Sequence, residues 1–282
     1  MYNERKNIGG DNRMVVDSNL PVDRDRLKNR LIRLVQEDEE ITSCFFGGSI
    51  GNRTEDLYSD IDARVVVSEG VDFKRKQQDI IKAVGECLFI DTFELTHSVS
   101  HYATFIKLDL FIYTEDMLSP SIWLKEIEIV KDNGYVQLLM EESQPMFYLV
   151  SQEEFDGVLN KYYGNYFEIY RTVRRDEPNH LEFLTLALKQ ALVSMWYMEK
   201  GYPPNDYLEW SKYEGARSAL SHLETEFLST YTPCAVEELI VFMKKIELLL
   251  LEASEKVATY HDLSFSRETF RKVHQRISLE EE

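Results

Sequence analysis

The chain has 282 residues and a formal net charge of −18, with 32 Lys and Arg against 50 Asp and Glu. Its hydrophobic content of 44% and aromatic content of 12% are enough for a sizeable core, so we expect a globular chain long enough for two domains. The acidic charge argues against nonspecific binding to a nucleic-acid backbone, which needs clustered Lys and Arg. We therefore expect no nucleic-acid partner.

The sequence predicts a cytoplasmic protein. No stretch approaches the roughly 20 apolar residues of a membrane span, so no membrane association is expected, and the first residues lack the apolar run of a signal peptide. The three cysteines, Cys44, Cys87 and Cys234, are widely spaced and odd in number, which favours reduced thiols over a disulfide framework.

In chain order, a helix is predicted after Leu20 and Pro21, and a strand over residues 41–47. Residues 47–62 follow, with the sequence Gly-Gly-Ser-Ile-Gly-Asn-Arg-Thr-Glu-Asp-Leu-Tyr-Ser-Asp-Ile-Asp. The small residues Gly48 and Ser49 would allow the backbone to approach phosphate groups closely. A glycine turn by itself is more often ordinary, so the interpretation depends on the acidic residues that follow it.

Two aspartates, Asp60 and Asp62, lead into the apolar residues 63–67. A strand alternates its faces with period two, so both carboxylates are expected on one face, together with Arg64. Hard cations such as Mg²⁺ need several oxygen ligands, and a third carboxylate is therefore expected.

Asp109 supplies a candidate for the third carboxylate. After a helix that is predicted to run through Leu88, the pattern predicts strands over residues 91–98 and 102–113. Lys107 and Asp109 lie opposite an apolar face in the second of these strands. A charge inside so apolar a strand is costly unless it has a partner or a solvated cleft. Close to two other carboxylates, Asp109 is expected to experience like-charge repulsion.

These residues resemble the nucleotidyltransferase superfamily of DNA polymerase beta. The resemblance consists of Gly48-Ser49, eleven residues from that serine to the first acid of Ser-Asp-Ile-Asp, and a later aspartate within an apolar strand. Gly-Ser-Ile-Gly followed by Thr54 and Tyr58 is most similar to the kanamycin and lincosamide nucleotidyltransferases. The similarity extends over residues 41–113 and fades beyond them.

The resemblance implies a site and a chemistry. Asp60, Asp62 and Asp109 would be the catalytic residues that hold Mg²⁺, with two ions expected, and ATP or another nucleoside triphosphate would be the co-substrate. The nucleotide-binding residues would be Gly48, Ser49 and Arg53. Attack on the α-phosphorus would then release pyrophosphate.

The C-terminal half reads as helical. An Asn133-Gly134 hairpin is predicted before it, and a domain boundary is placed near residues 143–145. This gives a nucleotidyltransferase domain over 1–144 and a helical substrate-binding domain over 145–282. Helices are predicted over 155–175, 181–199, 207–231 and 236–260. The fold class is α+β, with a mixed sheet flanked by helices, followed by a helical bundle.

The helical half also contains candidate site residues. Glu168 and Glu182 are candidates for a general base, a role that a glutamate of the helical domain has in the antibiotic-modifying relatives. Lys189 lies in a largely apolar helix and is a candidate for binding the triphosphate. The histidines His97 and His101 are four residues apart, but they fall in a predicted strand, which disfavours a metal pair.

The sequence leaves three functions open. The first is transfer of a nucleoside monophosphate, AMP from ATP, to a hydroxyl of a small antibiotic-like acceptor, an aminoglycoside or a lincosamide. The second is the same chemistry on a protein or RNA, and the third is a nucleotide-binding regulatory module without turnover. An acidic cleft would attract a polycationic acceptor, and the aromatic content of residues 147–170 is compatible with a homodimer.

Overall fold

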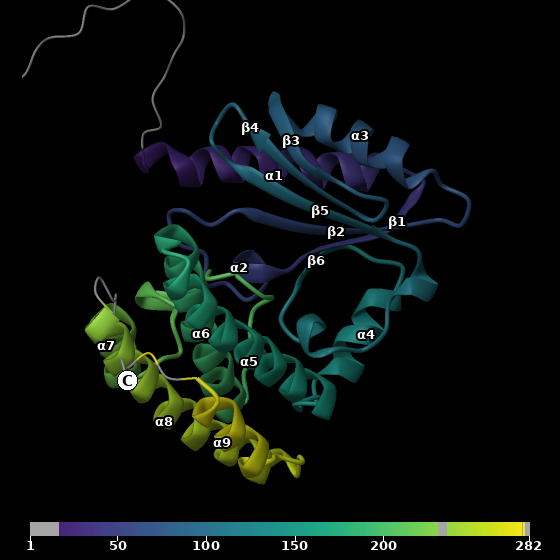
Figure 1. Ribbon diagram of the computed structural model, residues 1–282. Helices are drawn as coiled ribbons and strands as arrows, with labels where there is room; N and C mark the ends of the chain where they lie inside the picture. The colour runs from purple at the N-terminus through teal and green to yellow at the C-terminus, as the bar shows by residue number, and fades with distance from the viewer. Residues whose placement is uncertain (1–16, 231–235, 278, 280–282) are drawn as a thin grey trace, which may run out of the picture. The chain divides into compact units, whose positions relative to one another are not determined.

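The computed structural model describes residues 17–230, 236–277 and 279. The chain divides into two compact units, Met1–Met146 and Phe147–Glu282 (Figure 1). The division falls after residue 146, whereas the sequence places it after residue 144. Cys234 lies outside the described residues.

One mixed sheet forms the centre of the N-terminal unit. Its strands are β1 Ile41–Phe46, β2 Ile61–Val67, β3 Cys87–Phe93, β4 His97–Tyr102, β5 Lys107–Tyr113 and β6 Glu128–Lys131. They follow the order β3-β4-β5-β2-β1-β6. The β2 and β5 strands are parallel, and the other neighbours are antiparallel. The expected α+β class with a mixed sheet is confirmed.

Helices cover the two faces of this sheet unequally (Figure 1). The helical segments are η1 Asp17–Asn19, α1 Leu20–Glu37, α2 Gly48–Gly51, α3 Phe73–Val84, η2 Glu115–Met117, η3 Ile122–Leu124 and α4 Tyr135–Ser143. One face carries the larger core, in which α1 and α3 pack on alternate residues of β2 and β5, such as Ala63 and Leu108. On the other face, a smaller core joins Val136 and Leu139 of α4 to Phe45, Val66 and Leu124. Asp62 of β2 and Asp109 of β5, two of the three predicted carboxylates, lie on this same face of the sheet.

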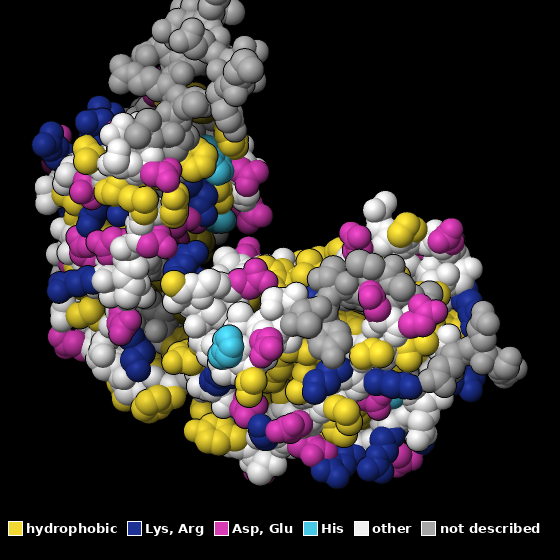
Figure 2. Space-filling view, turned by 90° about the vertical axis from the view of Figure 1, so that its left-hand side faces the viewer, with side chains coloured by type: hydrophobic (Ala, Val, Ile, Leu, Met, Phe, Trp, Pro, Cys, Tyr) yellow, Lys and Arg dark blue, Asp and Glu magenta, His cyan; other side chains and the backbone are white. Residues whose placement is uncertain are grey.

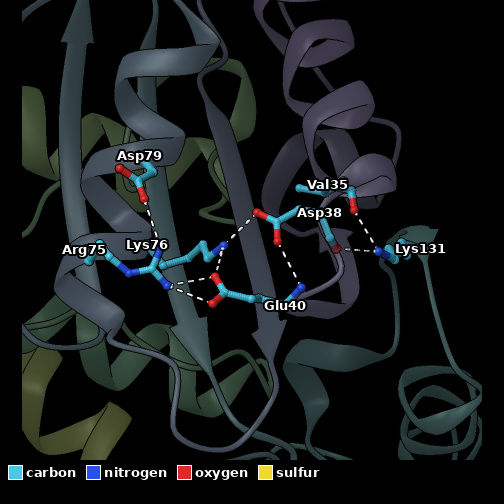
Figure 3. Close-up of polar contacts among 7 residues, drawn as sticks. All are labelled: Val35, Asp38, Glu40, Arg75, Lys76, Asp79 and Lys131. Atoms are coloured by element: carbon cyan, nitrogen blue, oxygen red, sulfur yellow. Dashed lines mark hydrogen bonds and ion pairs between the residues drawn. The ribbon is translucent and has the colours of Figure 1, made fainter.

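Ion pairs hold together the end of the sheet that lies away from the glycine turn (Figure 3). Lys76 of α3 is 4% exposed, and its ammonium lies 2.7 Å from Asp38 and 2.6 Å from Glu40. Lys131 of β6 donates to the carbonyl oxygens of Val35 and Asp38, both at 2.9 Å. The hydrogen bonds from Lys131 satisfy carbonyl groups at the C-terminus of α1, where a positive charge is favourable. These contacts therefore have a structural role, since they join α1, α3 and β6 at the start of β1.

The predicted boundaries between α3 and β5 were wrong. The helix predicted through Leu88 ends at Val84, because the chain at Gly85 passes close to α1; a Cβ there would lie 2.6 Å from Cδ2 of Leu27. Leu88 belongs to β3. The predicted strands 91–98 and 102–113 are three strands, since a second turn follows β4, with Phe105 at a φ of 68°.

The predicted Asn133-Gly134 hairpin was also wrong, because these residues begin α4. Gly134 precedes the helix with a φ of 100°. The Asp132 carboxylate accepts the N–H groups of Val136 and Gln137, each at 3.0 Å. These bonds satisfy donors of the first helical turn, so Asn-Gly ends a strand and begins a helix instead of joining two strands.

The C-terminal unit is helical. It contains α5 Gln152–Arg174, α6 Pro178–Glu199, η4 Gly215–Arg217, α7 His222–Thr230, α8 Val236–His261 and α9 Arg267–Gln275. The α6 helix is central, since all of its residues from Leu184 to Met198 except Leu186 are buried. The helix predicted over 207–231 was wrong in its first half. There, Gln190 of α6 accepts the N–H of Leu208 at 2.5 Å, so side-chain bonds replace the bonds of a helix.

Charges of both signs are interspersed over the face shown in Figure 2, and Lys and Arg do not gather there into one large patch. Within the described ranges, every helix is too short or too polar to cross a lipid bilayer.

Candidate active site

The turn after β1 packs directly on the strand that carries the aspartates. The Gly47 N–H donates to the Asp62 carbonyl oxygen at 3.0 Å. A Cβ on Gly47 would lie 2.2 Å from Nη1 of Arg64, and one on Gly48 would lie 1.9 Å from Oδ2 of Asp62. Gly48 also has a φ of +56°, which side chains rarely adopt. The positive φ of Gly48 therefore favours glycine there, and the close approach at Gly47 and Gly48 brings the turn against the side chains of Arg64 and Asp62.

Two of the three predicted carboxylates face each other across parallel strands. Asp62 of β2 and Asp109 of β5 are direct partners in the register. The first carboxylate, Asp60, lies one residue before β2, not inside the strand. The apolar neighbours Ile61 and Ala63 are buried on the opposite face. The alternation that the sequence predicts for this strand is thus observed. Asp62 and Asp109 are held by paired strands, and Asp60 lies just before the first of them.

Lys107 joins two of these carboxylates. Its Nζ lies 2.6 Å from Oδ2 of Asp60 and 2.9 Å from Oδ2 of Asp109. The Lys107 side chain is 35% exposed and that of Asp109 is 16% exposed. Burial alone would lower the pKa of Lys107, but its hydrogen bonds with the two carboxylates outweigh burial and raise that pKa above its usual range. Asp109 therefore has a cationic partner in Lys107, although its own charge still raises the pKa of Asp62, as the expected like-charge repulsion requires.

The unfavourable electrostatics fall on Asp62 instead. Burial raises the pKa of the Asp62 carboxyl, the negative charge of Asp60 raises it further, and Arg64 opposes this only in part. In addition, Oδ1 of Asp109 is buried and has no hydrogen-bond partner among the described residues. A buried acceptor without a donor is costly. Both observations indicate that the site lacks positive charge.

These observations bear on whether the site suits a divalent cation. In the described part of the chain, no three His, Cys, Asp or Glu side chains are already arranged around one point as metal ligands. The ammonium of Lys107 lies between two of the candidate ligands. The donors are nevertheless carboxylate oxygens, as Mg²⁺ prefers. A cation there would neutralise Asp62 and give the free oxygen of Asp109 a partner, so the residues fit the predicted ion.

Arg64 brings a second positive charge to the same face. Its guanidinium lies over the Phe111 ring, 5.0 Å from the centroid. The Nη1 atom is buried beneath Gly47 and has no hydrogen-bond acceptor in the described ranges. Arg64 lowers the pKa of Asp62, against the larger effects of burial and of Asp60 that raise it. We expect Arg64 to limit how far Asp62 is destabilised before a cation binds.

The remaining residues of the motif lie on the outer side of the turn. Ser49 is half-buried in α2. Arg53 is exposed and has a φ of 59°. The Thr54 N–H donates to the Ser49 carbonyl oxygen at 2.9 Å, which closes the loop around α2. This arrangement leaves the side chain of Arg53 accessible to a ligand.

The histidines of β4 are engaged in aromatic contacts. His97 stacks on Phe111 with ring centroids 4.2 Å apart, and His101 stacks on Phe89 at 4.5 Å. Both histidines lie on the sheet face of Asp109, because Val99 between them pairs with Asp109 in the register. The geometry favours packing over the metal pair that their spacing would suggest on a helix.

The candidates from the helical half have contacts within their own unit. Lys189 is 8% exposed, and its ammonium donates to the Leu228 carbonyl oxygen at 2.9 Å. Burial lowers the pKa of Lys189, and a nucleotide contact would require this bond to break. Glu168 forms an ion pair with Arg171 on the same helix. Glu182 is exposed on α6, so both glutamates remain predictions.

Sequence reasoning placed Lys107 and Arg64 on the face of the carboxylates but gave neither a role. The signal is present in the sequence. Each basic residue is two positions from an aspartate in a strand, Lys107 before Asp109 and Arg64 after Asp62. Such a spacing puts acid and base on the same face. It does not show that Lys107 also reaches Asp60, because that contact depends on the pairing of β2 with β5.

No protein-family model matches this chain, and no curated protein matches it in sequence. Seventeen chains among the solved structures are similar to it, and three of them show how far the similarity extends. An aminoglycoside 6-adenyltransferase from Bacillus subtilis has 16% identity and a TM-score of 0.40, over 89% of this chain and 96% of its own. A nucleotidyltransferase-like protein from Exiguobacterium sibiricum has 12% identity and a TM-score of 0.35, over 84% of this chain and 74% of its own.

The third is a chain of a GLD-2/RNP-8 complex, with 14% identity and a TM-score of 0.27, over 81% of this chain and 68% of its own. The first two proteins are of the nucleotidyltransferase class that the sequence motif resembles. Their substrates are properties of those proteins. The chemistry of this chain is inferred from its own carboxylates and glycine turn.

Proposed function

We propose that this protein is a metal-dependent nucleotidyltransferase that moves a nucleoside monophosphate, AMP from ATP, onto a hydroxyl of a small antibiotic-like acceptor. One observation carries the proposal. The carboxylates Asp62 and Asp109 are paired across parallel strands, with Asp60 beside them and the glycine turn packed on Asp62. This arrangement suits a phosphate chain and a cation held between turn and carboxylates.

Asp60 and Asp62 would hold the predicted Mg²⁺ ions, and Asp109 would complete the set of ligands. When bound, the ions would neutralise charge on the attacking hydroxyl oxygen of the acceptor and on the leaving oxygen of pyrophosphate. The protein supplies rigidity, since Asp62 and Asp109 are fixed by strand pairing on backbone whose other face is buried. Preorganised groups of this kind cost little reorganisation during the reaction.

The turn would bind the nucleotide. Backbone around Gly48 and the Ser49 hydroxyl would contact the β and γ phosphates, and the exposed Arg53 would contribute positive charge. A hydroxyl oxygen of the acceptor would form a bond to the α-phosphorus. The bond from the α-phosphorus to the oxygen that bridges to the β-phosphate would break, and pyrophosphate would leave with that oxygen.

Acceptor binding is assigned to the helical unit, over residues 145–282, with Glu168 as the proposed general base. The hydroxyl proton would pass to this carboxylate, whose present partner is Arg171. The net charge of −18 supports a cationic acceptor such as an aminoglycoside, because it would be attracted to the protein. A lincosamide is the second small-molecule class to test.

Mass spectrometry of both antibiotic classes tests the proposal. Each compound is incubated with the protein, Mg²⁺ and one nucleoside triphosphate at a time. We expect one compound to gain the mass of a nucleoside monophosphate with the wild-type protein and to remain unmodified with Asp62→Asn. Modification by Asp62→Asn at the wild-type rate would contradict the assignment of the site.

A further inference from the structure

Arg24 occupies an unusual place on α1. The buried stripe of this helix consists of Leu20, Arg24, Leu27, Leu31 and Val35. Arg24 thus holds a position that the spacing would assign to an apolar residue, and only 6% of it is exposed. Arginine is rarely buried to this extent unless its guanidinium has partners. Its partners therefore indicate what the residue does.

Those partners belong to the loop that leads into β2. Nη1 of Arg24 donates to the Asp56 carbonyl oxygen at 2.7 Å and to the Ser59 carbonyl oxygen at 3.1 Å. The two carbonyl groups are at the ends of the turn formed by residues 56–59. One buried guanidinium nitrogen thus holds both ends of this turn against α1.

The turn is closed by its own side chains. The Ser59 hydroxyl accepts the Asp56 N–H at 2.9 Å and donates to Oδ1 of Asp56 at 2.9 Å. The same Oδ1 accepts the N–H of Tyr58 at 3.0 Å. Ser59 is 5% exposed. The next residue is Asp60, so the position of this rigid turn determines the position of the Asp60 backbone, from which the carboxylate extends.

We propose that Arg24 is a positioning residue for Asp60, and that it acts through the turn of residues 56–59. This inference rests on the proposed function, because Asp60 is taken there as a metal ligand. Asp60 lies outside β2 and lacks the strand pairing that fixes Asp62 and Asp109. The bonds from Arg24 supply the missing constraint. Loss of such supporting bonds typically lowers metal affinity by about 10–100-fold.

The test is Mn²⁺ binding to the full-length protein, measured by electron paramagnetic resonance of the free ion. Arg24→Met keeps most of the side-chain volume and removes both hydrogen bonds. We expect its dissociation constant for Mn²⁺ to rise at least about tenfold. Arg24→Lys, which keeps one donor group, should restore part of the affinity. Hydrogen exchange at residues 56–62 should be faster in Arg24→Met.

Two controls separate positioning from general stability. Leu27→Ala, on the same buried stripe, should lower the melting temperature without weakening Mn²⁺ binding well below that temperature. Arg26→Met removes an exposed arginine whose partner is Asp23, and it should change neither property. If Arg24→Met does not fold, Ser59→Ala opens the same turn from the loop side and should also weaken Mn²⁺ binding.

The outcomes distinguish this inference from the proposed function. Mn²⁺ affinity in Arg24→Met equal to the wild-type value, or an equal loss in Leu27→Ala, would overturn the role of Arg24 and leave the proposed function intact. Where Arg24→Met does not fold, unchanged affinity in Ser59→Ala has the same meaning. A wild-type protein that binds no Mn²⁺ would overturn the metal site and this inference together.

Discussion

Replacement of Lys107 by methionine should destabilise the metal-free protein and strengthen its binding of divalent cations. Lys107 forms ion pairs of 2.6 Å with Asp60 and 2.9 Å with Asp109. A hydrogen bond to a charged group contributes about 1.5–3 kcal/mol when well buried. Since Lys107 is 35% exposed and Asp60 is 34% exposed, solvent screening should reduce the total to about 1–2 kcal/mol. For chains of this size, that corresponds to a melting temperature lower by about 2–8 °C.

The cation affinity should change in the opposite direction. In Lys107→Met, no ammonium group competes for the oxygens of Asp60 and Asp109, and we expect Mn²⁺ to bind about tenfold more tightly, which corresponds to ~1.4 kcal/mol. Saturating Mn²⁺ should then remove the difference in melting temperature.

The assay is thermal unfolding with EDTA and with Mn²⁺, alongside Mn²⁺ titration. Lys28→Met is a matched control, because Lys28 makes an ion pair of 2.8 Å with Glu128 outside the site. It should lose stability equally with and without Mn²⁺. Weaker Mn²⁺ binding by Lys107→Met, or a melting temperature that does not respond to Mn²⁺, would refute the reasoning.

Three further predictions concern Asp62, Gly48 and His274. Asp62→Asn should abolish nucleotidyl transfer while it raises the melting temperature in EDTA, because burial and Asp60 disfavour the charged carboxylate; a lower melting temperature would contradict this. Gly48→Ala should cost about 1–3 kcal/mol in urea unfolding and should reduce transfer, because its φ is +56° and its Cβ would meet Asp62. Burial lowers the pKa of His274 from 6.5 in the folded protein. As the pH falls, His274 therefore takes up a proton in the unfolded chain before it does so in the folded protein. The stability that neutral His274 supports is present above pH 6.5 and is lost as the pH falls through the lowered pKa; urea unfolding between pH 8 and 5 should show this slope in the wild type and lose it in His274→Gln.

The face of β2 that carries Asp62 could be predicted from the sequence because the signal is local. Strand alternation places Asp62 opposite the buried Ala63, and this depends only on residue spacing. The turn was predicted because its glycines are adjacent to those acids in sequence. The role of Lys107 could not be predicted in the same way, because its contact with Asp60 joins strands that are far apart in the chain.

Two of the errors in secondary structure have different origins. Asn133-Gly134 is a strong hairpin signal, but the Asp132 carboxylate binds N–H groups of the following helix and the chain continues as α4. Residues near Leu208 have helical periodicity, but the buried Gln190 of α6 binds their backbone. The Asp132 bonds span four and five residues and are a local signal of a helix start, whereas the Gln190 bond joins positions 18 residues apart and cannot be read from local pattern. Arg24 is comparable, since its position on an apolar stripe has meaning only when its loop partners are known.

The central claim is that the α-phosphate of a nucleotide is transferred. Its most direct test uses ATP labelled at the α-phosphorus and, separately, at the γ-phosphorus, together with Mg²⁺ and the acceptors named above. We expect the α label on the acceptor and the γ label in pyrophosphate. A γ label on the acceptor would show transfer of the terminal phosphoryl group and would rule out transfer of a nucleoside monophosphate.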